Sequence, residues 1–105
     1  MTVKIHHDAA ARRFAAELEH GEAVVDYEMP DGGTLDLTRT FVSEDLRGEG
    51  LAGQVVRYAL DWARHHGRRV IATCPYVARF IERHPEYAEL TVRPESSAPT
   101  IPGAS

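Results

Sequence analysis

The sequence predicts an α/β fold in which an antiparallel β-meander leads into a strand-helix-strand crossover. Short β-like runs separated by turn residues fill residues 12–42. From residue 51 onward the apolar side chains recur at helical spacing instead. A second apolar run and a second amphipathic segment follow within residues 70–83. The chain of 105 residues is expected to form one domain, because single domains most often contain about 100–150 residues.

Three antiparallel strands are predicted in the first half of the chain. Residues 12–18 and 22–29 are rich in apolar and β-branched side chains, and Glu19-His20-Gly21 between them has the composition of a hairpin turn. Pro30-Asp31-Gly32-Gly33 is a second turn signal. Residues 34–42 then alternate apolar and polar side chains, which predicts the third strand of the meander.

The main helix is predicted over residues 50–66. Its apolar arc is wide, so we expect this helix to lie against the sheet. Arg64-His65-His66 places positive or titratable side chains at the last turn, and Gly67 supplies a stop. The large apolar side chains at helical spacing are Leu51, Val55, Tyr58 and Trp62.

A fourth strand is predicted at residues 70–73, and a second helix at residues 75–83. The strand is apolar throughout, as expected of a strand covered on both faces. The helical crossover places it parallel to residues 34–42. Residues 89–92 are predicted to add one last strand. A ligand is expected at the strand ends, near residues 43–50.

Charge and composition exclude several classes of protein. The net charge of −4 is the opposite of the basic excess typical of nucleic-acid binders. Residues 57–93 nevertheless hold seven basic and four acidic groups, which would favour an anionic small ligand. No run approaches the roughly 18 apolar residues of a membrane span. The histidine pairs at 6–7 and 65–66 are adjacent and point apart, so no metal site is predicted.

The domain organisation and location are expected to be simple. Cys74 is the single cysteine, so no intrachain disulfide can form and a cytoplasmic location is expected. Residues 94–105 contain three prolines and three serines, which predicts a flexible tail. Residues 1–93 then form the folded domain, and a monomer is the expected state.

The central chemical feature is the loop Arg47-Gly48-Glu49-Gly50-Leu51-Ala52-Gly53, which lies between a strand and the main helix. Its free backbone N–H groups and the helix dipole together favour an anion. A dinucleotide-binding loop is disfavoured because no acidic residue ends the next strand, and a Walker loop because no Gly-Lys-Ser/Thr follows. The alternative is a glycine-rich turn between strand and helix that binds no ligand.

Read as Arg47-x-x-Gly50-x-Ala52, the loop resembles the Arg/Gln-x-x-Gly-x-Gly/Ala motif with which GNAT N-acetyltransferases hold the pyrophosphate of acetyl-CoA. Three further segments match in order: Thr40-Phe41-Val42, Thr73-Cys74-Pro75-Tyr76-Val77 and Arg83-His84-Pro85-Glu86-Tyr87. Over roughly residues 10–90 the chain resembles the minimal, single-domain GNAT-like family within the Gcn5-related acetyltransferase superfamily. The resemblance implies a small GNAT-like fold with an acyl-CoA site at a splayed pair of strands.

The resemblance also assigns roles to residues. Loop residues would hold the pyrophosphate, and Cys74 would lie near the thioester, where it either lines the site or acts as a nucleophile. Arg39 departs from the family, which commonly has histidine at this position. If that histidine acts on the substrate, the arginine cannot replace it as a base, since arginine is always protonated. The expected cofactor-binding residues are Arg47, Gly48, Glu49, Gly50, Leu51, Ala52, Cys74, Tyr76 and His84.

Transfer to an amine also needs proton acceptors and donors. Glu44 and Asp45, just before the loop, are candidate bases for the amine, directly or through water, or else solvated caps of the helix. Tyr76 and Tyr87 are candidate acids for the departing thiolate, or packing residues with a polar tip.

The expected function is therefore transfer of acetyl from acetyl-CoA to an amine, either a protein lysine or a small amine, without a metal. One alternative is a CoA-binding regulatory module without turnover, which Arg39 and the lack of a clear base favour. Another is a small partner-binding domain that makes its contact through the proline-rich residues 94–105.

Overall fold

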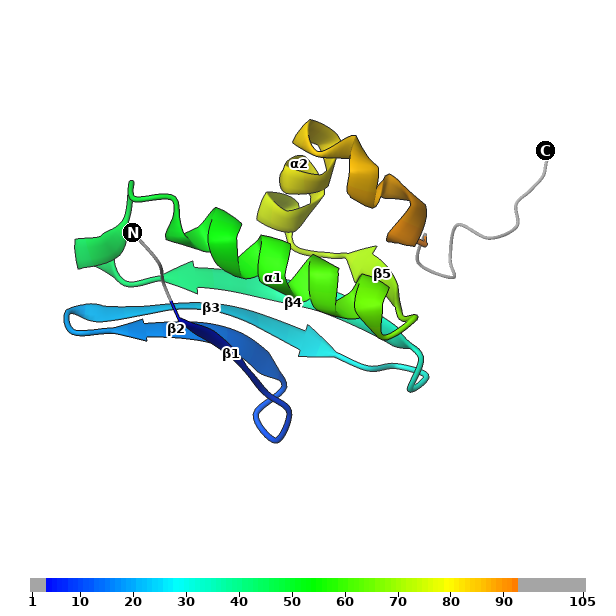
Figure 1. The fold of residues 1–105 in the computed structure, drawn as a ribbon, viewed down its shortest axis with the longest axis horizontal. Helices are drawn as coiled ribbons and strands as arrows, with labels where there is room; N and C mark the ends of the chain where they lie inside the picture. The colour runs from blue at the N-terminus through cyan, green and yellow to red at the C-terminus, as the bar shows by residue number, and fades with distance from the viewer. Residues whose placement is uncertain (1–3, 93–105) are drawn as a thin grey trace.

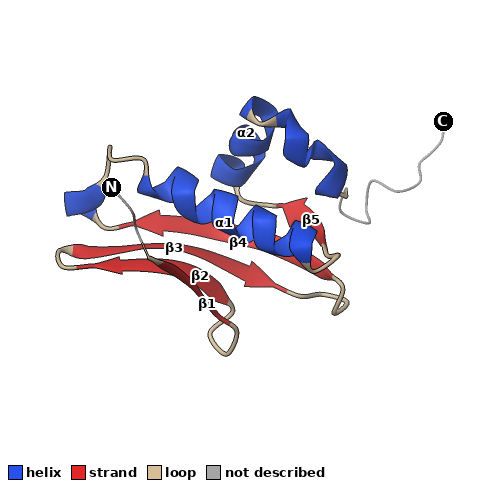
Figure 2. Cartoon of the chain, in the orientation of Figure 1, coloured by secondary structure: helices blue, strands red, loops and turns tan. Residues whose placement is uncertain are grey.

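The computed structural model describes residues 4–92, so the predicted tail at residues 94–105 lies outside the described residues. Figure 1 shows a mixed sheet with α1 lying across one face, and Figure 2 shows the same view by element type. The strands are β1 (Ile5–Asp8), β2 (Arg13–Leu18), β3 (Gly21–Glu28), β4 (Thr34–Val42) and β5 (Arg69–Ala72). The helices are α1 (Leu51–His65) and α2 (Pro75–Arg83), with 3₁₀ helices η1 (Glu44–Leu46) and η2 (Pro85–Leu90).

The sheet confirms the predicted α/β arrangement. Its strand order is β1-β2-β3-β4-β5; the first four strands pair antiparallel, and β5 pairs parallel with β4. The crossover through α1 provides this parallel pair, since two parallel neighbours cannot be joined by a tight turn. β4 and α2 begin and end at the predicted residues, and α1 lies within the predicted range of 50–66.

β1, the first strand of the sheet, was not predicted from the sequence. β1 pairs with β2 from Ile5 opposite Ala16 to Asp8 opposite Arg13. Its His-His-Asp composition carries little intrinsic strand preference. Tertiary contacts fix it instead. His7 stacks on Phe14, with ring centroids 4.3 Å apart.

The predicted last strand at residues 89–92 is wrong. The chain forms η2 up to Leu90, and only Thr91 makes an isolated parallel bridge, to Val70. β5 is also not covered on both faces as expected: Val70 is buried, whereas Arg69 is exposed and Ile71 is partly exposed. Both helices contribute to one hydrophobic cluster with side chains of β2 to β5, so they cover the same face of the sheet.

The core lies between α1, α2 and the covered face of the sheet. Phe14, Leu35 and Leu37 supply the largest buried side chains of the strands, and Leu60 does so for α1. The predicted inward face of α2 is confirmed, since Val77, Phe80 and Ile81 are its buried residues.

A β-bulge interrupts the pairing of β3 with β4. Tyr27 pairs with Leu37 but the preceding residue, Asp26, pairs with Arg39, so Thr38 is an extra residue in β4. Side chains alternate along a strand, and an extra residue reverses the alternation beyond it. The odd-numbered side chains of β4 therefore face α1 before the bulge, and the even-numbered ones do so after it.

Candidate functional site

β4 extends beyond the end of β5, and this opens a gap in the sheet. Parallel pairing ends at Leu37 opposite Ala72, and the N–H of Cys74 then donates to the carbonyl of Leu37 (2.9 Å). Within the described residues 4–92, residues 38–42 have no strand beside them on that side. The edge leaves backbone donors and acceptors available to a ligand.

A pocket of about 500 Å³ lies at this edge of β4. It combines the end of β4 with the predicted glycine loop and one residue of α2. Its lining residues are Thr40, Phe41, Val42, Leu46, Arg47, Gly48, Gly50, Leu51, Ala52 and Tyr76. Six of the nine predicted cofactor-binding residues are therefore brought together here, while Glu49, Cys74 and His84 are not among the lining residues.

The glycine loop begins α1 with its amides free. Gly50 is the N-cap residue, with a left-handed φ of 76°, and no side chain caps the helix. The first intrahelical bond runs from Gln54 N–H to the Gly50 carbonyl, so the amides of residues 51–53 have no intrahelical partner. Gly48 also has a positive φ, 87°. The loop therefore brings amides without intrahelical partners and the positive end of the helix dipole to the lining of the pocket.

Two other residues hold this loop in place. Arg47 Nε donates to the carbonyl of Val42 (3.1 Å), which ties the loop to the end of β4. Ser43 joins it to the β2–β3 hairpin: Ser43 Oγ accepts from Glu22 N–H (2.9 Å), and Ser43 N–H donates to the Glu22 carbonyl (2.8 Å). Ser43 was not predicted as a site residue, because a lone serine before a 3₁₀ turn carries no distinguishing pattern.

Cys74 lies next to the pocket, at the N-cap of α2, and is only 6% exposed. Its sulfur is 3.4 Å from the hydroxyl of Thr40, a lining residue of the pocket. Burial opposes ionisation of the thiol. Hydrogen bonding from Thr40 and from the amides of Tyr76 and Val77 outweighs it, and holds the pKa of Cys74 below its usual value.

Tyr76 forms the wall of the pocket on the α2 side. α2 packs closely on the first turn of α1 here: a Cβ placed on Gly53 would lie 3.5 Å from the Tyr76 hydroxyl and 3.6 Å from the Phe80 ring. Tyr76 is itself 37% exposed. Its hydroxyl therefore lies where the pocket meets the start of α1.

The other predicted acid–base residues lie away from the pocket lining. Glu44 and Asp45 are exposed on η1. Tyr87 is buried, donates to Asp61 Oδ1 (2.6 Å), and accepts from Arg57 (3.1 Å). Burial and Asp61 raise its pKa. Tyr87 therefore joins α1 to η2.

His84 ends α2 and borders a separate, smaller pocket. Its ring stacks on Phe80, with centroids 4.0 Å apart, and its Nδ1 donates to the Phe80 carbonyl (2.8 Å). Tyr76 borders both this pocket and the larger one. The two pockets are therefore neighbours.

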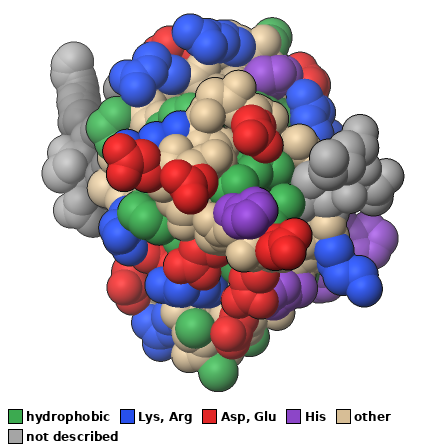
Figure 3. Space-filling view, turned by 90° about the vertical axis from the view of Figure 1, so that its left-hand side faces the viewer, with side chains coloured by type: hydrophobic (Ala, Val, Ile, Leu, Met, Phe, Trp, Pro, Cys, Tyr) green, Lys and Arg blue, Asp and Glu red, His purple; other side chains and the backbone are tan. Residues whose placement is uncertain are grey.

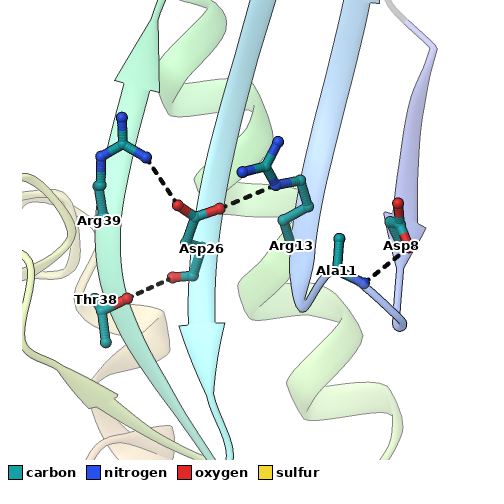
Figure 4. Close-up of polar contacts among 6 residues, drawn as sticks. All are labelled: Asp8, Ala11, Arg13, Asp26, Thr38 and Arg39. Atoms are coloured by element: carbon teal, nitrogen blue, oxygen red, sulfur yellow. Dashed lines mark hydrogen bonds and ion pairs between the residues drawn. The ribbon is translucent and has the colours of Figure 1, made fainter.

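Arg39 points to the face of the sheet away from α1, together with Asp26 and Arg13 (Figure 4). It forms an ion pair with Asp26 (3.0 Å), which also pairs with Arg13 (3.1 Å). Its guanidinium lies 5.5 Å from the centre of the Phe41 ring. The bulge in β4 is the cause, because it turns Thr40 toward α1 and Arg39 away from it. Arg39 is thus remote from the thiol.

Figure 3 looks at the end of the molecule where the β2–β3 hairpin, η1 and the start of α1 meet. Acidic side chains occupy much of the centre of this face, with hydrophobic side chains between them. Over residues 4–92, no three His, Cys, Asp or Glu side chains gather as a metal site. Neither described helix has the length and hydrophobicity to cross a membrane.

Comparisons with known proteins identify the family of the chain, two relatives and a protein of the same fold. The family described as GCN5-related N-acetyl-transferase matches residues 13–90. Protein NATD1 of Danio rerio is 32% identical over 91 residues, covering 83% of each chain. Protein NATD1 of Homo sapiens is 29% identical over 85 residues, covering 79% of this chain and 75% of the relative. A GCN5-like protein of Staphylococcus aureus, solved by NMR, has the same fold: its TM-score is 0.66 at 19% identity, covering 91% of this chain and 94% of the other.

Proposed function

The chain belongs to the GCN5-related N-acetyltransferase family, and we propose that it transfers the acetyl group of acetyl-CoA to an amine. The observation that carries the proposal is the glycine loop, which places the uncapped N-terminus of α1 on a pocket of about 500 Å³. The acceptor is an amine of a protein lysine or of a small molecule.

The loop fits a diphosphate group. The amides of residues 51–53 lack intrahelical partners, and the helix dipole adds a positive potential. A Cβ at Gly48 or Gly50 would meet no atom within 4 Å, so the loop leaves room for a ligand to approach its backbone. Residues 47–52 would therefore hold the pyrophosphate, and the free end of Arg47 would add a positive charge.

The open edge of β4 fits the arm that joins the diphosphate to the thioester. Residues 38–42 have no strand beside them on the pocket side, although the Val42 carbonyl already accepts from Arg47. An amide-containing chain can pair with such an edge as an extra strand does. When bound, acetyl-CoA supplies the thioester whose acyl carbon the amine attacks. Tyr76, which lines the pocket from α2, would donate a proton to the departing sulfur.

We assign Cys74 to the wall beside the thioester. Its side chain is almost completely buried and engaged with Thr40, which suits a lining residue. Direct transfer then needs a base to take a proton from the amine. Glu44, exposed on η1, would serve this role through water.

Calorimetry with acetyl-CoA tests the assigned loop. The wild type should bind, and Gly50→Glu should abolish binding by filling the pocket. Gly67→Glu is the matched control, because Gly67 has a similar φ of 67° and open space but lies beyond the other end of α1. Unchanged affinity in Gly50→Glu, or equal loss in both variants, would refute the loop as the binding site.

A CoA-binding module without turnover is the second candidate. It is favoured by one observation: no predicted base lines the pocket. Mass spectrometry of amines and basic peptides incubated with acetyl-CoA separates the two, because only the enzyme adds an acetyl group. Intact mass of the protein after acetyl-CoA alone tests Cys74, since an adduct that is absent from Cys74→Ala would show a covalent route.

A further inference from the structure

A second pocket, of about 200 Å³, lies along α2 and carries two arginines. It is lined by Tyr76, Arg79, Phe80, Arg83 and His84. These positions are spaced at three, four, seven and eight residues from the first, so they share one face of the helix. The pocket is therefore a basic surface of α2 in a chain whose net charge is −4.

Arg79 and Arg83 are exposed, and neither forms an ion pair with an acidic side chain among residues 4–92. They are four residues apart, a spacing at which like charges repel each other on a helix. Arg83 lies in the last turn, where the helix dipole favours a cation, but Arg79 lies one turn earlier. A bound anion would supply the counter-charge that neither arginine finds among residues 4–92.

This basic pocket adjoins the start of α1. Tyr76 borders both it and the 500 Å³ pocket. Phe80 borders it and also a groove that contains Gly50 and Gly53. The Phe80 ring lies 3.6 Å from a Cβ placed on Gly53, which fixes the distance between the two helices at this point. Tyr76 and Phe80 therefore connect the pocket of the two arginines to the start of α1.

We infer that Arg79 and Arg83 bind the 3′-phosphate of coenzyme A and so select CoA over its 3′-dephosphorylated form. This inference rests on the proposed function. The ribose of CoA carries the pyrophosphate on its 5′ carbon and a phosphate monoester on its 3′ carbon. Once the pyrophosphate lies on the loop of α1, the monoester must lie within a short reach of it. The forked guanidinium groups match the geometry of a phosphate.

The neighbouring arginines are less available for this phosphate. Arg57 donates to the Tyr87 hydroxyl (3.1 Å), lies 3.9 Å from Glu86, and stacks over aromatic rings. Arg47 donates through Nε to the Val42 carbonyl, which holds its side chain at the end of β4. The pair on α2 is therefore the free cationic group of the described chain next to the loop.

Calorimetry with CoA and with 3′-dephospho-CoA, at one fixed low salt concentration, tests the inference. The wild type should bind CoA about tenfold more tightly, as one net charge-assisted hydrogen bond predicts. In the double variant Arg79→Gln/Arg83→Gln, affinity for CoA should fall to that for the dephosphorylated ligand, whose own affinity should stay within about twofold. Arg69→Gln is a control for charge removal away from the pocket, because it removes one positive charge from the exposed start of β5; it should keep the preference.

Two results would overturn the inference while leaving the proposed function intact: equal affinity of the wild type for both ligands, or equal weakening of both in the double variant. Loss of the preference in Arg69→Gln would also overturn it, because a diffuse field would then be responsible. Binding of neither ligand would instead remove the CoA-dependent function itself.

Discussion

The hydroxyl of Thr40 lies 3.4 Å from the sulfur of Cys74, and this contact bridges the two parallel strands at the point where they part. Thr40 belongs to β4, and Cys74 follows β5 at the N-cap of α2. The contact therefore couples the thiol to the open edge of β4.

Thr40→Val should raise the pKa of the Cys74 thiol, because it removes a hydrogen bond that favours the thiolate. Burial, which opposes ionisation, would remain. The pH dependence of thiolate absorbance measures the change, and its midpoint should move to higher pH. Thr91→Val is the control, since the Thr91 hydroxyl donates to the Ala88 carbonyl instead. An unchanged midpoint in Thr40→Val would show that the Thr40 hydroxyl does not lower the pKa of the thiol.

Gly50→Ala should destabilise the fold by about 1–2 kcal/mol, because a left-handed φ of 76° is strained for a residue with a Cβ. Gly50→Asn should cost less, since asparagine tolerates this region better. Urea unfolding measures both. A Cβ here meets open space, so crowding contributes nothing. A larger loss in Gly50→Asn than in Gly50→Ala would contradict the backbone explanation.

Gly21→Ala should cost about 2 kcal/mol or more, because the new Cβ would lie 2.5 Å from the Cβ of Ser43 and the φ of 149° is itself unfavourable. The clash separates the β2–β3 hairpin from the segment that leads to the glycine loop. Gly33→Ala is a matched control, because its nearest neighbour would be 3.9 Å away. Thermal unfolding compares the two; similar melting temperatures would show that the contact at Ser43 relaxes freely.

His7 should make the protein less stable at mildly acidic pH. Burial and the nearby His66 lower its pKa, while Asp8 partly opposes this effect. The unfolded chain then binds more protons than the fold between the lowered pKa and about 6.5, so stability falls as the pH drops through that window and is unaffected above it. His7→Phe should flatten the decline. Urea unfolding midpoints of the wild type and of His7→Phe at about pH 7.5 and 5.5 test this. An equal decline in both proteins would show that a group other than His7 is responsible.

Much of the fold could be predicted because its strongest elements carry local patterns. The helical spacing of Leu51, Val55 and Trp62 defines α1, and Pro75 marks the first residue of α2. β1 has no such pattern. It is held by pairing with β2 and by the bond between His7 Nε2 and the Tyr27 hydroxyl (2.6 Å), which joins residues 20 positions apart.

The candidate site was also predictable from the sequence only in part. The glycine loop is readable because positive φ values at Gly48 and Gly50 require glycine. The position of Glu44 relative to the pocket was not readable, because nearness in sequence says nothing about the direction of a side chain on η1. The bulge at Thr38 was also not readable, since many residue types occupy the extra position.

That bulge decides which side chain of β4 stands beside the thiol. If β4 kept Thr38 but ran on without the bulge, the alternation that places Leu35 and Leu37 in the core would turn Arg39 to the same side. The guanidinium of Arg39 would then point at the sulfur that now faces a hydroxyl. The irregularity at Thr38 therefore keeps a permanent cation away from the thiol and gives it a neutral neighbour.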